Sequence, residues 1–238
     1  MSRTEITDTI EKHPMPVPGL GDNFLKFLDG ATYPCVGAKS ALARGAIETH
    51  EFGELGDRGN DRSLADGLVQ FVAKIEGKAC DKDIVHSYVA IFRGPDDMNE
   101  LRFESSLWSQ LWRIHKIDVL AGNDPAHDVS SDVDSPQFSL SMAGHPFFVI
   151  GLHPHASRLA RRFSHPAMVF NSHRQFEKLR EDGRYVKMQA ATRSRDVDLQ
   201  GSVNPNLADF GDASEARQYS GRKVEAGWRC PYDFKEQP

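Results

Sequence analysis

The segment from Phe147 to Leu152 constrains the fold of this chain more than any other, because it is an uninterrupted apolar run of strand length. A strand without alternating polar side chains is typically buried on both faces of its sheet. Helices or irregular chain must then cover each face. The sequence therefore predicts an α+β fold, with a central sheet and flanking helices.

Apolar periodicity and turn residues place the other elements around this strand. Further strands are expected at about 84–92, 138–143 and 167–170. Ser63 is expected to cap one of the helices. The helices are expected at about 23–30, 38–44, 63–75, 98–115 and 175–187.

The two ends of the chain differ in composition. Residues 1–18 contain three prolines and are predicted to form a flexible arm before a single domain at 19–238. The stretch 196–238 is rich in Gly, Asn, Pro and Asp, yet it keeps apolar anchors such as Leu207 and Phe210 that a disordered tail would lack. We expect this long irregular segment to pack over the domain and close a pocket.

Charge and cysteine content exclude several classes of protein. The formal net charge is −5, whereas a nucleic-acid surface is normally basic. No apolar run approaches the roughly 20 residues that a membrane helix needs. The three cysteines are far apart and form no CxxC pair, which favours a reducing, cytoplasmic location and no standard zinc site. We expect a cytoplasmic protein with no nucleic-acid or membrane partner.

The predicted buried strand is followed by histidines and arginines. His153 and His155 come directly after it, and Arg158 and Arg162 follow within ten residues, while His145 precedes it. Imidazole can ligate iron, and a guanidinium can bind a carboxylate with two hydrogen bonds. Heme needs both, for its iron and its propionates. A capped turn followed by a solvated helix face would give the same pattern.

Three other places carry candidate groups. Residues 210–222 combine acid, guanidinium and phenol groups, as in a binding loop or an exposed salt-bridged turn. Cys35 could supply a thiolate to iron, or could be a small buried apolar residue. Glu104 lies one helical turn before Trp108, on an apolar face, and needs either a guanidinium substrate or an internal arginine as its partner.

Several motifs, taken in order, resemble the YqcI/YcgG family from about Tyr33 to Pro231. They are Tyr33-Pro34-Cys35-Val36-Gly37-Ala38-Lys39, Gly151-Leu152-His153-Pro154 with Ser157-Arg158, Phe170-Asn171, Gln175-Phe176-Glu177, Gln200-Gly201-Ser202-Val203-Asn204-Pro205 and Tyr219-Ser220-Gly221-Arg222. Family members with assigned roles are heme-dependent N-hydroxylases, among them the arginine hydroxylase of cycloserine biosynthesis and the pre-guanitoxin N-hydroxylase.

The resemblance implies heme b, molecular oxygen, an external electron donor or redox partner, and N-hydroxylation of the guanidine of arginine or an arginine-derived molecule. His153 falls in a family motif and is our expected axial ligand, with His145, His155 and Cys35 as alternatives. Glu104 and Glu215 are expected to face the guanidinium. The expected heme-binding residues are His153, Arg158, Arg162, Arg217, Tyr219 and Arg222.

Two other functions are compatible with the same residues. A heme sensor or carrier would use the ligand and the propionate partners without turnover. A binding module without heme would use His153 only structurally. The substrate, the electron donor and a homodimeric state are left open by the sequence.

Overall fold

The protein is described by a computed structural model that covers residues 19–78, 80–81 and 83–235. The arm expected at 1–18 lies outside these residues. The model confirms the mixed fold, in which a five-stranded sheet has the strand order β1-β2-β5-β4-β3. β1 and β2 are parallel and the other pairs are antiparallel. The strands are β1 (Ile47–Glu54), β2 (Ser87–Gly94), β3 (Leu140–Met142), β4 (His145–Leu152) and β5 (Ala167–Ser172).

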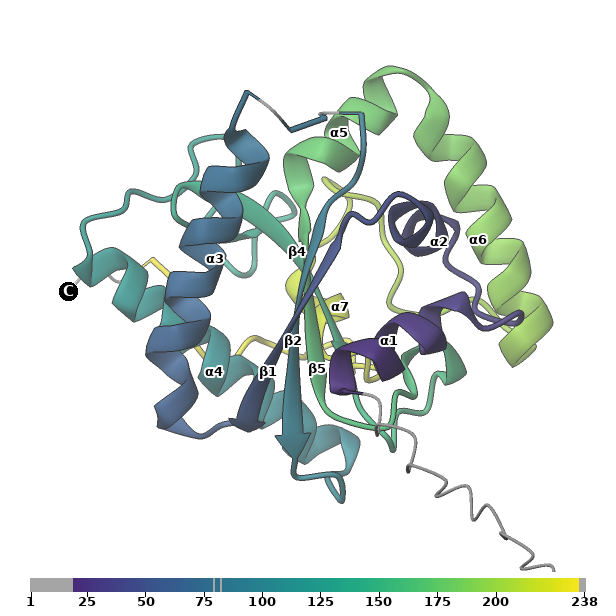
Figure 1. Ribbon diagram of the computed structural model, residues 1–238, viewed down its shortest axis with the longest axis horizontal. Helices are drawn as coiled ribbons and strands as arrows, with labels where there is room; N and C mark the ends of the chain where they lie inside the picture. The colour runs from purple at the N-terminus through teal and green to yellow at the C-terminus, as the bar shows by residue number, and fades with distance from the viewer. Residues whose placement is uncertain (1–18, 79, 82, 236–238) are drawn as a thin grey trace, which may run out of the picture.

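Helices cover both faces of this sheet, as Figure 1 shows with α3 on one side and α1, α2 and α6 on the other. None of the helices in the described part of the chain is long and apolar enough to cross a membrane. The helices are α1 (Leu20–Asp29), α2 (Val36–Ala43), α3 (Asp61–Glu76), α4 (Glu100–Leu120), α5 (His173–Glu181), α6 (Arg184–Gln200) and α7 (Ala216–Tyr219).

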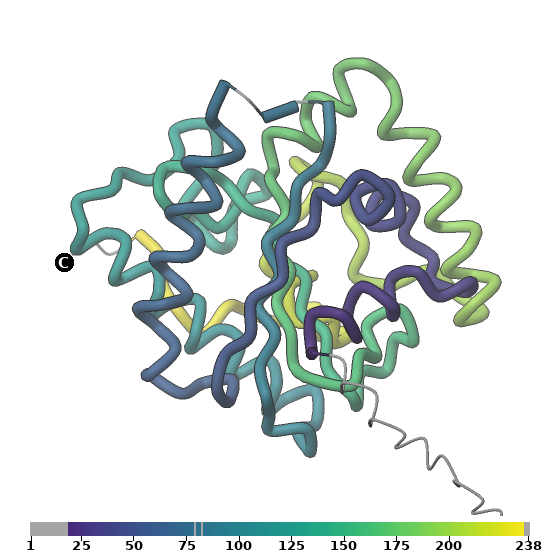
Figure 2. The backbone as a smooth tube through the Cα atoms, in the orientation of Figure 1, coloured from purple at the N-terminus to yellow at the C-terminus, as the bar shows by residue number. Residues whose placement is uncertain are grey.

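The central strand β4 is buried on both faces, as its composition predicts. Phe147 and Val149 belong to a large core with α3 and α4, whereas Leu152 belongs to a second core with α1. Successive side chains of a strand point to opposite faces, so one apolar run supplies both cores. In the view of Figure 2, the yellow-green start of the C-terminal segment lies between the sheet and α6, and its yellow end lies on the side of α3.

Some predicted boundaries are wrong. The helix expected at 175–187 is two helices, because Gly183 adopts a left-handed conformation with φ of 74° between α5 and α6. Helix α6 then continues to Gln200, into the segment expected to be irregular. Ser63 lies inside α3, where its hydroxyl donates to the carbonyl of Asn60 (3.1 Å). Strand β1 was not expected at all.

Candidate functional site

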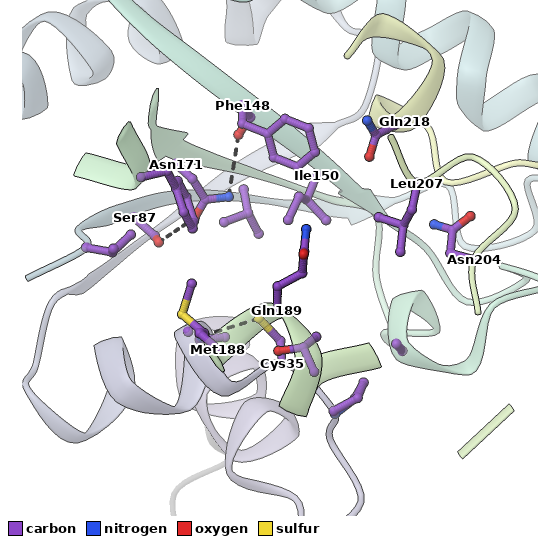
Figure 3. Close-up of a pocket in the computed structure, with 18 of the residues that line it drawn as sticks. Cys35, Ser87, Phe148, Ile150, Asn171, Met188, Gln189, Asn204, Leu207 and Gln218 are labelled. Carbon is purple, nitrogen blue, oxygen red and sulfur yellow. Dashed lines mark hydrogen bonds between the residues drawn. The ribbon is translucent and has the colours of Figure 1, made fainter. Parts of the chain in front are cut away.

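A cavity of about 300 Å³ lies between the layer formed by α1, α2 and α6 and the face of the sheet that carries Ile150 and Leu152. Figure 3 shows Phe148, Ile150 and Asn171 on the sheet side, across from Cys35 and Met188. The C-terminal segment closes another side, which confirms that it covers a pocket. Its lining residues there are Asn204, Leu207, Ala208, Asp209, Phe210, Glu215 and Gln218.

Glu215 lines this cavity, and one oxygen of its carboxylate has no hydrogen-bond partner among the described residues. The residue is 5% exposed. Its Oε1 atom lies 3.4 Å from Nδ1 of His173, and its buried Oε2 atom has no hydrogen-bond partner among the described residues. Burying a carboxylate oxygen without a partner costs free energy, and a hydrogen-bond donor from a ligand would reduce that cost.

His173 also lines the cavity and begins α5, directly after β5. Its Nε2 atom lies 3.3 Å from Oε1 of Glu177, one helical turn further on. The buried ring therefore lies between two carboxylates. The side chain of Glu177 is 41% exposed, so this carboxylate reaches solvent.

Arg161 brings a cation to the same cavity. Its Nη1 atom donates to the carbonyl oxygens of Gly151 (3.3 Å) and Tyr219 (3.1 Å). None of the carboxylates in the described ranges forms an ion pair with it, and burial lowers the pKa of its guanidinium to about 10. A partly buried guanidinium whose hydrogen bonds within the described ranges use only Nη1 is suited to an anionic ligand.

Arg158, in contrast, is already satisfied although it lines the cavity. Its Nη2 atom donates to a carboxylate oxygen of Asp196 and to the carbonyl oxygen of Ser202 (2.8 Å), and its Nη1 atom donates to the Ser202 hydroxyl (3.1 Å). These bonds join the loop after β4 to the end of α6. Arg158 therefore shapes the cavity wall.

Cys35 is placed in the wall by the start of α2. It is the N-cap residue, and its Sγ atom accepts a hydrogen bond from the backbone N–H of Ala38 (3.4 Å). Burial raises the pKa of its thiol. Cys35 and His173 are thus two residues with potential iron-ligating atoms at this cavity.

His153 lies outside the set of residues that line the cavity. It is 1% exposed and its ring stacks on Phe103 of α4, with 4.4 Å between ring centroids. Its Nδ1 atom has no partner among the described residues. His145 is bound at both ring nitrogens, to Glu76 (2.7 Å) and Ser172 (2.8 Å), and His155 is exposed.

Glu104 and Arg222 have each other as partners. Nε of Arg222 donates to Oε2 of Glu104 (2.8 Å), and the Ser220 hydroxyl donates to Oε1 (3.1 Å). Both ionic side chains are buried, and this pair joins α4 to the C-terminal segment. The internal arginine is thus the partner that Glu104 has in this structure.

The remaining expected residues also lie away from the cavity. Nε of Arg162 donates to the carbonyl oxygen of Ala156 (3.0 Å). Arg217 donates to the carbonyl oxygens of Trp228 and Glu225 (3.1 and 2.7 Å). The Tyr219 hydroxyl, deep in the main core, donates to the carbonyl oxygen of Phe147 (3.1 Å). Of the eight expected residues, the structure brings Arg158 and Glu215 to one cavity.

Comparison with known proteins gives one match. A sequence profile described as the YqcI/YcgG family matches residues 24–233. No curated protein and no solved structure matches the chain.

Proposed function

The chain belongs to the YqcI/YcgG family, and from this premise we propose that it is a heme-dependent oxygenase. Its proposed reaction is the N-hydroxylation of the guanidine group of arginine or of an arginine-derived small molecule. We place both the heme and the guanidine in the cavity between the sheet, α2, α6 and the C-terminal segment.

The observation that carries this proposal is the free oxygen of Glu215 at a mainly apolar cavity. A guanidinium is planar, permanently charged and costly to bury without a carboxylate. Glu215 offers that carboxylate, and His173 contacts its other oxygen. The carboxylate would fix the guanidinium plane and hold one nitrogen in a constant position, which is the main task of a protein in cofactor chemistry.

The residues that line the cavity also fit a heme. Apolar side chains such as Val89, Ile150 and Val169 would face a porphyrin plane. Arg161 has donors for a propionate, and Cys35 or His173 could ligate iron. Heme would supply oxygen binding and O–O cleavage with electrons from an external donor.

The experiment is a heme titration followed by a panel of guanidines. We expect a stoichiometric Soret band, a spectral shift on addition of arginine or agmatine, and an N-hydroxyguanidine product by mass spectrometry. Absence of heme binding would overturn the proposal. Heme binding without any response to guanidines would instead indicate a heme sensor or carrier.

The matched variants are Glu215→Gln and Glu181→Gln. Loss of a buried carboxylate that pairs with a charged ligand costs about 3–5 kcal/mol. Glu215→Gln should therefore abolish the guanidine response at concentrations that saturate the wild type, with heme content intact. Glu181 is exposed at the end of α5 and serves as the control, which should behave as wild type.

A further inference from the structure

We propose that the Cys35 thiolate is the axial ligand of the heme iron, so that this is a heme-thiolate site. The inference rests on the proposed heme site in this cavity, and it replaces His153 as the expected ligand.

The position of Cys35 is the first argument. Figure 3 shows it on the α2 side of the cavity, across from Ile150 and Phe148 of the sheet. The next cavity-lining residues of α2 are Gly37 and Ala38, and the thioether of Met188 from α6 packs beside Gly37 next to the Cys35 sulfur. A ligand bound between the sheet and α2 would lie near Cys35.

The local backbone favours a metal-bound thiolate. Cys35 caps α2, and the N–H of Ala38 donates to its sulfur. Backbone N–H groups and the positive end of a helix stabilise a thiolate and tune its donation to a metal. Without iron, burial keeps the thiol protonated by raising its pKa. Formation of the iron–sulfur bond would release that proton to solvent.

The histidines are less suited to ligate iron at the cavity. His153 stacks on Phe103 and does not line it. His145 is bound at both ring nitrogens. His173 lines the cavity, but its two nitrogens face Glu215 and Glu177. The hydrogen-bond partners of the Cys35 sulfur in the described chain, in contrast, include no carboxylate and are the backbone N–H groups of Ala38 and Gly37.

A second observation shows independently that this cavity is built to hold a ligand. Glu215 is 5% exposed, lines the same cavity and keeps one oxygen without a partner in the described chain. Within this cavity, Cys35 suits the iron, whereas Glu215 suits a cationic hydrogen-bond donor.

The test is spectroscopic and needs no turnover. The heme-loaded wild type is reduced and treated with carbon monoxide, and its ferric form is examined by electron paramagnetic resonance. We expect the red-shifted Soret band of a thiolate carbonyl complex and a low-spin thiolate signal. Cys35→Ser should lose both features, by loss of heme or by change of ligand. Cys230→Ser, at a half-buried cysteine outside the cavity lining, should keep them.

Failures of the two proposals are distinguishable. Heme that binds with an imidazole-type carbonyl spectrum in both the wild type and Cys35→Ser would overturn the thiolate ligand and leave the heme site standing. His153→Ala and His173→Gln would then identify the imidazole by loss of that spectrum. A wild type that retains no heme overturns both proposals.

Discussion

The Nδ1 atom of His173 lies 3.4 Å from Oε1 of Glu215, and both side chains are buried at the cavity. The opposite nitrogen of the same ring approaches Glu177, which is 41% exposed. One imidazole therefore connects a carboxylate at the surface with one in the interior. That contact is made by Oε1, whereas the buried Oε2 of Glu215 has no hydrogen-bond partner among the described residues.

This contact predicts the effect of His173→Gln. A polar contact with a buried carboxylate is expected to contribute on the order of 1.4 kcal/mol, which is a tenfold change in affinity. We expect guanidine binding to weaken about tenfold or more in a spectral titration, with the heme retained. Glu177→Gln should have a smaller effect because that carboxylate is solvated. Wild-type guanidine affinity in His173→Gln would contradict the positioning role.

Arg161 predicts an anionic group in the cavity, since it is partly buried and forms no ion pair with a carboxylate of the described ranges. Arg161→Gln should weaken the binding of a carboxylate-bearing ligand. Reduced heme affinity would identify a propionate, whereas a lost preference for arginine over agmatine would identify the substrate carboxylate. Arg162→Gln, at an exposed position, is the control. An Arg161→Gln protein unchanged in both measurements would refute the prediction.

Gly221 controls the position of Arg161. It has a φ of 82°, and a Cβ atom there would lie 2.6 Å from Cδ of Arg161. Gly211 has a φ of 94° with open space around it, so it is a matched control. Alanine at either site should cost about 1–2 kcal/mol in urea unfolding, because both need a left-handed conformation. Only Gly221→Ala should also weaken heme or guanidine binding, and equal binding in the two variants would contradict this.

The Glu104–Arg222 pair predicts a structural effect rather than a binding effect. Removing one member of a buried ion pair typically costs about 3–5 kcal/mol. Glu104→Gln should therefore lower the free energy of unfolding, measured with urea, while the folded fraction binds heme and guanidines as the wild type does. Glu215→Gln should show the reverse pattern. A stable Glu104→Gln protein that no longer responds to guanidines would assign Glu104 to the ligand site instead.

The sequence predicts the parts of the fold that its apolar pattern controls. The run in β4 indicates burial on both faces, and Phe210 in the C-terminal segment indicates that this segment covers a pocket. Strand β1 escapes prediction because it is an edge strand with exposed charged residues, including Glu51 and Glu54. The full length of helix α6 escapes prediction because the helix has no apolar stripe. Its one buried residue is Asp196.

The candidate site is harder to predict because strand alternation decides which residues face it. Leu152 lies on the side of the cavity, and the next residue, His153, faces Phe103 of α4. The sequence shows that His153 follows a buried strand but not which face holds the cavity. Arg161 and His173 reach the cavity from separate segments, and the signal for each was a basic side chain in the stretch that follows a predicted strand.

The burial of His153 makes the stability of this protein sensitive to acid. Burial lowers the pKa of its imidazole from 6.5 to about 4. Between these values the unfolded chain binds a proton that the folded chain does not, so the free energy of unfolding falls as the pH falls from 6.5 towards 4. The full difference corresponds to about 3 kcal/mol, because one pKa unit is worth about 1.4 kcal/mol. His145, whose pKa is lowered similarly, contributes in the same direction.

His153→Gln removes one of these two groups and should flatten the pH dependence. Urea unfolding at about pH 7 and about pH 5 would measure it, and over that interval the variant should lose about 2 kcal/mol less stability than the wild type. His155→Gln is the control, because the neighbouring imidazole is exposed and should leave the pH dependence unchanged. If the free energy of unfolding changed equally with pH in His153→Gln and the wild type, the imidazole of His153 would be able to take up a proton without unfolding the chain.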